Sequence, residues 1–290
     1  MALGNARNSL RLSLLASIGL VPLACGGNAE SRAGNEAGAT KRGTSGSEEK
    51  ARTCFTGVCG RPFLIEAQAR VAAVTPNTAW LSSTLAQPQV AHLTAAERAA
   101  LARHWQRLGQ MEHASIAAFA RFSLQLLALG APSELVEACT QALADETEHA
   151  KVCFKLASSY AGQALGPGPL DIGGSLGCVS LGDIVDLVLA EGCFGETSAA
   201  LDALEAADTA TDPVLREVYA KIASDEQRHA ELAFRFLRWA LTRDAPVVRR
   251  RIAASVAEPP SHHQAAREVT VPCLNALLGR PLGFATIARA

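Results

Sequence analysis

Two copies of one short pattern contain the residues best suited to chemistry in this sequence. Asp-Glu-x-x-His-Ala occurs at Asp145–Ala150 and again at Asp225–Ala230. A shuffled chain of the same composition would contain Asp-Glu-x-x-His only about 0.014 times. In a helix, a glutamate and a histidine three residues apart project from one face, where a carboxylate and an imidazole can bind the same metal ion. The repeat therefore predicts two halves of a metal site.

Both motifs lie on the apolar stripes of the helices expected to contain them. Apolar residues recur there at spacings of three and four, in phase with Glu146 and His149 in one helix and with Glu226 and His229 in the other. Burying an ionised glutamate costs several kcal/mol unless a partner compensates it, and these stripes contain no lysine or arginine. We therefore expect a metal cation to supply the missing positive charge.

A further carboxylate lies on the stripe of an earlier helix. Thr94 and Glu97 form a capping-box pattern, which predicts a helix that starts there and continues to about Gly130. The apolar stripe of this helix includes Trp105, Glu112 and Phe119. Glu112 is thus the third candidate carboxylate ligand.

The helix that precedes the second motif offers two candidates for the fourth carboxylate, Glu191 and Glu196. Glu112 comes 34 residues before Glu146, Glu191 comes 35 before Glu226, and Glu196 only 30 before it. In an antiparallel hairpin, ligands that face each other lie equally far from the turn. The similar separations of 34 and 35 residues in the two hairpins therefore favour Glu191. Glu196 stays open as an alternative or additional ligand, as does a carboxylate that moves on and off the metal.

This set of residues resembles the ferritin-like di-iron carboxylate superfamily, in the rubrerythrin and bacterial tRNA-hydroxylase branch. The resemblance covers about residues 93–243. It implies an all-α fold, a ferritin-like four-helix bundle, with two iron ions in its core and manganese as an alternative. Its ligands would be Glu112, Glu146, His149, Glu191 (or Glu196), Glu226 and His229.

The Gly- and Pro-rich segment between the second and third helices fits the same topology. Residues 162–182 could reach about 65 Å when extended, whereas a helix of 28 residues is about 40 Å long. The segment can therefore cross the whole bundle, which is the long crossover of ferritin-like proteins. We expect N- and C-terminal extensions, residues 53–92 and 244–290, to pack on this bundle.

The N-terminus has the features of an export signal. Arg7 and Arg11 precede an apolar stretch that ends at Cys25, and this resembles the lipobox of bacterial lipoproteins. We expect residues 1–24 to be a signal peptide, Cys25 to be lipidated, and residues 25–52 to form a flexible tether. The protein would then be exported and anchored by lipid to the membrane of the bacterial cell envelope, facing the periplasm.

The overall charge excludes one class of partner. The chain has 27 basic and 28 acidic residues, so it has no field that would attract nucleic acid. Two function classes follow. In the first, the protein performs oxidation that depends on dioxygen or peroxide, as an oxygenase, peroxidase or ferroxidase with an external electron donor. In the second, it is a non-enzymatic metal-binding or iron-storage lipoprotein of the envelope.

Several other residues have more than one interpretation. Asp145 and Asp225 either accept hydrogen bonds from the histidines or face solvent. Cys54 and Cys59 could form a small disulfide loop, and Cys178 could pair with Cys273. We expect three cysteines to be buried thiols inside helices: Cys139, Cys153 and Cys193.

Overall fold

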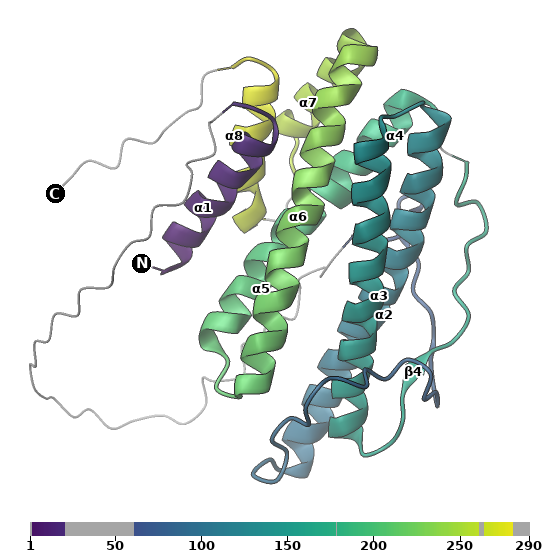
Figure 1. Cartoon of the computed structure of the whole chain (residues 1–290), viewed down its shortest axis with the longest axis vertical. Coiled ribbons are helices and arrows are strands. Elements are labelled where there is room, and N and C mark those ends of the chain that lie inside the picture. The colour runs from purple at the N-terminus through teal and green to yellow at the C-terminus, as the bar shows by residue number, and fades with distance from the viewer. Residues whose placement is uncertain (1, 21–60, 178, 261–263, 281–290) are drawn as a thin grey trace, which may run out of the picture.

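The computed structural model describes residues 2–20, 61–177, 179–260 and 264–280 (Figure 1). Helices make up most of these residues, and the strands within them are two-residue segments. The predicted all-α class is therefore confirmed.

Helices α2 (Ala95–Ala128) and α3 (Ser133–Ala161) form a hairpin. The predicted capping box starts α2: the Glu97 backbone amide donates to the Thr94 hydroxyl at 3.2 Å, and the Thr94 amide donates to the Glu97 carboxylate at 2.8 Å. Gly162 ends α3 in the left-handed conformation, with φ of 71°, which glycine adopts without a steric penalty. The two helices pack against each other through extensive contacts.

The next helical rod changes its winding along its length. It consists of α4 (Leu181–Leu187), the π-helix η1 (Val188–Glu196) and α5 (Thr197–Thr209), which follow one another with helical backbone angles at each junction. Helix α6 (Pro213–Arg243) follows after a short turn capped by Asp212. Helix α6 packs against α5, η1 and α3, so it connects the two hairpins (Figure 1).

Short strands attach the segment that precedes α2 to these helices. Strands β1 (Leu64–Ile65) and β2 (Gln68–Ala69) pair antiparallel, with Leu64 opposite Ala69. Strand β3 (Val74–Thr75) pairs antiparallel with β4 (Gly166–Pro167), in the connection between α3 and α4. Phe63, which is 1% exposed, packs with α2 residues Ala114 and Ala118.

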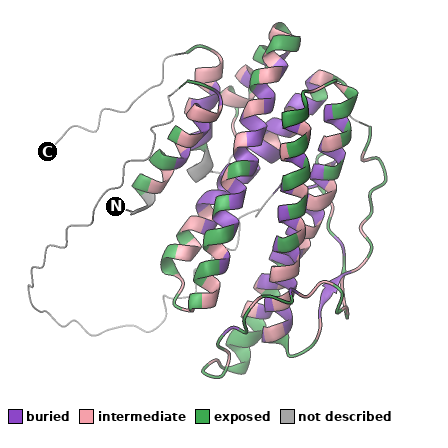
Figure 2. Ribbon diagram, viewed as in Figure 1, coloured by how far each residue is buried: buried purple, intermediate pink, exposed green. Residues whose placement is uncertain are grey.

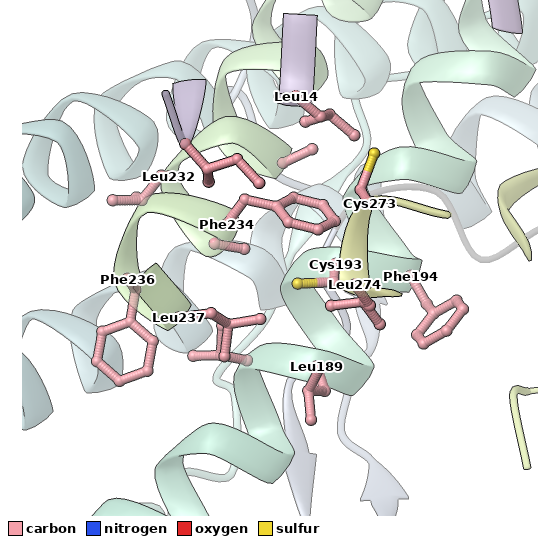
Figure 3. Close-up of a cluster of buried hydrophobic side chains, with 14 of the residues drawn as sticks. Leu14, Leu189, Cys193, Phe194, Leu232, Phe234, Phe236, Leu237, Cys273 and Leu274 are labelled. Atoms are coloured by element: carbon pink, nitrogen blue, oxygen red, sulfur yellow. The ribbon is translucent and has the colours of Figure 1, made fainter. Parts of the chain in front are cut away.

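Helices α7 (Ala245–Ala257) and α8 (Gln264–Leu277) follow α6 and pack beside α4, η1 and α5. Buried side chains line the surfaces where helices face one another, and exposed ones line the outside (Figure 2). The largest apolar cluster joins η1, α6, α8 and α1 and includes Phe194, Phe234 and Leu274 (Figure 3). It lies beside the segment of η1 that contains both candidate glutamates.

The N-terminal residues form helix α1 (Ala2–Ser17), which lies beside α8 and α6 (Figure 1). Leu10, Leu14 and Leu15 are each at most 1% exposed, and Gln227 of α6 donates to Ser13 at 3.0 Å. Removal of residues 1–24 is a processing event, so it stays a prediction. Cys25, the tether and the Cys54–Cys59 pair lie outside the described residues.

Within the described ranges, no helix combines the length and apolar character needed to cross a bilayer.

Candidate metal centre

Six ionisable side chains from four helical elements meet in the interior. Helix α2 contributes Glu112, and η1 contributes Glu196. Helices α3 and α6 contribute the Glu-x-x-His pairs, Glu146 with His149 and Glu226 with His229. None of the six is more than 3% exposed. The two motifs recognised in the sequence therefore do converge, as the helical phase predicted.

The six residues, here called the cluster, divide into two overlapping groups. One group contains Glu112, Glu146, His149 and Glu226, and the other contains Glu146, Glu196, Glu226 and His229. Within each group, one ligand atom from every residue lies within 4.8 Å of all the others. Glu146 and Glu226 belong to both groups, so their carboxylates connect the two groups.

The atoms that face the middle of the cluster meet only one another, and the shortest histidine–carboxylate contact among them joins His229 Nδ1 and Glu146 Oε1 at 3.1 Å. Nine such buried atoms belong to it: one carboxylate oxygen of Glu112, both oxygens of Glu146, Glu196 and Glu226, and the Nδ1 atoms of His149 and His229. Leaving a buried polar atom unpaired costs about 1–3 kcal/mol, and more when it is charged. Carboxylate oxygens and imidazole nitrogens are the donors that iron and manganese accept, so this donor set fits a divalent metal pair.

The outer nitrogen of each histidine is bound to the aspartate of the opposite motif. His149 Nε2 lies 2.9 Å from Asp225 Oδ2, and His229 Nε2 lies 3.2 Å from Asp145 Oδ2. Arg228 bridges both carboxylates, with Nη2 2.8 Å from Asp145 and Nη1 2.7 Å from Asp225. The two aspartates therefore accept hydrogen bonds from the histidines, which is one of the two interpretations of the sequence. A proton on Nε2 leaves the Nδ1 lone pair directed at the cluster, as a metal ligand requires.

Without metal, protons must take the place of the cations. Burial raises the pKa of Glu146 and of Glu196 well above the usual range, so both carboxyls favour the neutral form. Burial opposes protonation of the two histidines, but hydrogen bonds to the aspartates and the surrounding carboxylates raise the pKa of His149 and of His229 to about 10. The cluster therefore needs positive charge whether or not metal is bound.

The carboxylate that η1 contributes to the cluster is Glu196, whereas the hairpin spacing favoured Glu191. Glu191 is fully buried but belongs to neither group of ligand atoms. The spacing argument assumed α-helical winding of about 100° per residue, which separates residues five apart by about 140°. A π-helix closes its hydrogen bonds from i to i+5, so residues five apart lie close to one face. The π winding of residues 188–196 thus allows both glutamates to point inward.

Glu191 instead binds two buried arginines. Arg121 Nη2 lies 2.5 Å from Glu191 Oε1, and Arg61 Nε lies 3.3 Å from Oε2. The guanidinium of Arg61 also stacks on Phe119 and Phe122, with ring centroids 4.8 and 4.6 Å away. The expectation that no buried lysine or arginine compensates the interior carboxylates is wrong for Glu191, because both arginines lie off the apolar stripes that contain the candidate ligands.

Sequence reasoning missed these arginines and the π-helix. The available signal was the pair of glycines, Gly192 and Gly195, within an otherwise helical segment. A Cβ atom on Gly192 would lie only 2.6 Å from the Cβ of Ala233 on α6. The glycine therefore permits close contact between η1 and α6.

Two further ring residues, Tyr219 of α6 and His113 of α2, belong to neither group of ligand atoms. Tyr219 stacks on Trp105 with a centroid distance of 5.2 Å, and His113 contacts the edge of Trp80 at 4.9 Å. Cys139, Cys153 and Cys193 are buried free thiols, as predicted. Cys273 is also free and buried, and its proposed partner Cys178 lies outside the described residues, as do His262 and His263.

Comparison of the chain with protein-family models, curated proteins and solved structures finds no match.

Proposed function

We propose that this chain is a ferritin-like di-metal carboxylate protein that binds two iron ions and performs oxidation with dioxygen or peroxide. The supporting observation is the set of nine buried oxygen and nitrogen atoms that face one another within the cluster. Four glutamates with two neutral imidazoles balance the charge of two divalent ions. The same donors accept manganese, which is the alternative metal.

In this proposal the fold is a ferritin-like four-helix bundle. Its helices would be α2, α3, the rod formed by α4, η1 and α5, and α6. Residues 163–180 would be the crossover between the second and third helices. The support is that one ligand or ligand pair comes from each of these elements, in the order expected for this superfamily.

Each residue of the cluster has a definite task in the proposed site. Glu112 and His149 would hold metal in one group, Glu196 and His229 would hold it in the other, and Glu146 and Glu226 would contribute to both groups. Asp145 and Asp225 hold the histidine protons on Nε2 through the hydrogen bonds described above. Iron held by these residues would supply the electrons for reduction of dioxygen or peroxide, and the burial of all six residues would limit the access of water to it.

Oxygen consumption tests this function against the alternative of a passive metal-binding or iron-storage protein. Metal-free protein is loaded with ferrous iron without oxygen and then mixed with aerated buffer. We expect rapid oxygen uptake in proportion to protein, faster than for free ferrous ions in the same buffer. Glu146→Gln should abolish it, and Glu137→Gln, a change of an exposed residue on the same helix, should not. Stable metal without oxygen uptake would favour the passive role.

We also propose that the mature protein is an exported lipoprotein anchored through Cys25. The sequence of the first 25 residues supports this proposal. Cys25→Ser should move the protein from membrane to soluble fractions of the cell, whereas unchanged fractionation would rule out the anchor. The mass of the purified protein then reports whether residues 1–24, including helix α1, have been removed.

A further inference from the structure

A pocket of about 480 Å³ lies beside the metal cluster without containing its carboxylates. Helices α3 and α6 form two of its walls, and residues 82–86 form the third. A hydrogen bond from the Ser82 amide to the Lys151 carbonyl, 3.3 Å long, holds this third segment against α3. His149 is the one cluster residue among those lining the pocket. A molecule bound here would therefore contact one half of the proposed metal site from outside.

The middle of the pocket is apolar. Val152 comes from α3, Val218 and Ile222 come from α6, and Leu85 comes from the third wall. Val218 and Ile222 are 6% and 8% exposed, so they lie at the floor rather than at the rim. An apolar body with the dimensions of one aromatic ring and a short chain would cover these side chains.

Charged groups surround this apolar region, and most are acidic. The lining contains one lysine, Lys221, and four carboxylates, those of Asp145, Glu148, Glu217 and Asp225. Lys221 is already bound to Asp225.

The two glutamates of the pocket differ in their partners. Glu148 lies 2.6 Å from Lys151. Glu217 has no hydrogen bond or ion pair within the described part of the chain. Asp145 and Asp225 are both bound by Arg228, so the exposed Glu217 is the carboxylate of the pocket that has no ion pair within the described residues, and a cation would supply its partner.

We propose that this pocket binds a small organic cation with an apolar body, such as a primary amine carrying a single ring. The apolar body lies against Val152, Val218 and Ile222, and the ammonium group faces Glu217. Bound in this way, the molecule lies beside His149, which lines the pocket, whereas His229 does not line it. The proposal goes beyond the proposed function, and the pocket requires no metal.

Calorimetric titration of the metal-free full chain tests the ligand class with three probes of similar size. These probes are 2-phenylethylammonium, neutral 2-phenylethanol and anionic 3-phenylpropanoate. We expect the ammonium to bind most tightly and the carboxylate most weakly. Equal affinity for all three, or no binding of the ammonium, would overturn the proposal.

Two pairs of variants test the place of binding. Val152→Phe fills the pocket and should reduce the ammonium affinity at least tenfold, whereas Val136→Phe, at a half-buried position elsewhere on α3, should not. Glu217→Gln should reduce it about threefold, the scale of an exposed ion pair. Glu137→Gln is its matched control. Unchanged affinity in both pocket variants would contradict the assignment.

The two histidines provide an internal control for position. In nuclear magnetic resonance spectra of metal-free protein, the ammonium probe should shift the ring resonances of His149 more than those of His229. Equal shifts would place the ligand elsewhere. Because these measurements use metal-free protein, their failure leaves the proposed metal function untouched, and a failure to bind metal leaves the pocket untouched.

Discussion

Each histidine of the cluster is held by the aspartate that precedes the ligand glutamate of the other motif. His149 pairs with Asp225 and His229 with Asp145. Each motif therefore provides the aspartate partner for the histidine of the other motif, across the contact between α3 and α6. Each copy of the six-residue pattern thereby contributes a carboxylate and a histidine to the cluster, and an aspartate that accepts from the histidine of the other copy. This exchange explains why an aspartate stands at the same position in both copies.

The assignment of Glu196 to the cluster and of Glu191 to the arginines makes opposite predictions for two isosteric substitutions. Glu196→Gln should lower metal content and leave the stability of metal-free protein unchanged or higher, because it removes a carboxyl whose burial is unfavourable. Glu191→Gln should leave the metal ligands in place and lower stability by about 3–5 kcal/mol, because two buried guanidinium groups lose their counter-charge. Metal analysis and urea unfolding of both variants decide the assignment. Loss of metal in Glu191→Gln alone would reverse it.

The histidines also determine how metal-free protein responds to pH. Their pKa of about 10 in the folded protein lies above the unfolded value of about 6.5. Their contribution to stability is therefore fully present below pH 6.5 and is lost as the pH rises towards 10. The raised pKa of Glu146 and of Glu196 also makes the stability of the folded protein fall as the pH rises. Thermal unfolding in the presence of a chelator should show a melting temperature that falls between pH 6.5 and 10, and a rising one would contradict the protonation scheme.

At the scale of the elements, the winding of one helix determines which carboxylate reaches the cluster. The change from α to π winding between α4 and α5 occurs where Arg61 and Arg121 bind Glu191 and where Gly192 meets Ala233. Arg121 also donates to the Leu64 carbonyl at 2.6 Å, which attaches β1 to the same network. The segment around β1 therefore contributes to the position of η1, which in turn positions Glu196.

Substitution of Gly192 tests the close contact between η1 and α6. Gly192→Ala places a Cβ 2.6 Å from that of Ala233, and neither atom can move without its backbone. We expect a loss of stability of roughly 1–3 kcal/mol, which exceeds the gain in helix propensity, and weaker metal binding. Gly182→Ala in α4 is the control, since its Cβ would meet the flexible end of Arg251, 3.2 Å away, and Val247 Cγ1 at an ordinary contact distance of 3.6 Å. Equal effects in both variants would show that the contact at Gly192 has no special role.

For the molecule as a whole, sequence alone was sufficient for the helical class and for five of the six cluster residues. Glu112, the two Glu-x-x-His motifs and the capping box at Thr94 all follow regular α-helical periodicity, and the structure has them where that periodicity places them. Glu196 could not be selected in this way, because a π-helix shifts the phase and its hydrogen-bond pattern has no simple signature in sequence. The arginines were missed because their counter-charge, Glu191, is distant in the chain.

The N-terminus shows a second limit of local sequence patterns. An apolar stretch after Arg7 and Arg11 predicts a cleaved export signal, yet the same leucines are buried against α6 and α8 as helix α1. Apolar character favours both outcomes, since a segment suited to export also packs on an apolar surface. Cleavage at Cys25 would uncover the apolar residues of α6 and α8 that α1 contacts.

The central claim is that the cluster holds a pair of metal ions, and metal analysis of purified protein tests it most directly. Protein expressed with added iron and freed of loosely bound metal should contain close to two transition-metal ions per chain, while Glu146→Gln, which lacks a shared carboxylate oxygen, should contain fewer than one. Circular dichroism establishes that both proteins are folded. Folded wild-type protein that contains no metal after exposure to both iron and manganese would contradict the account.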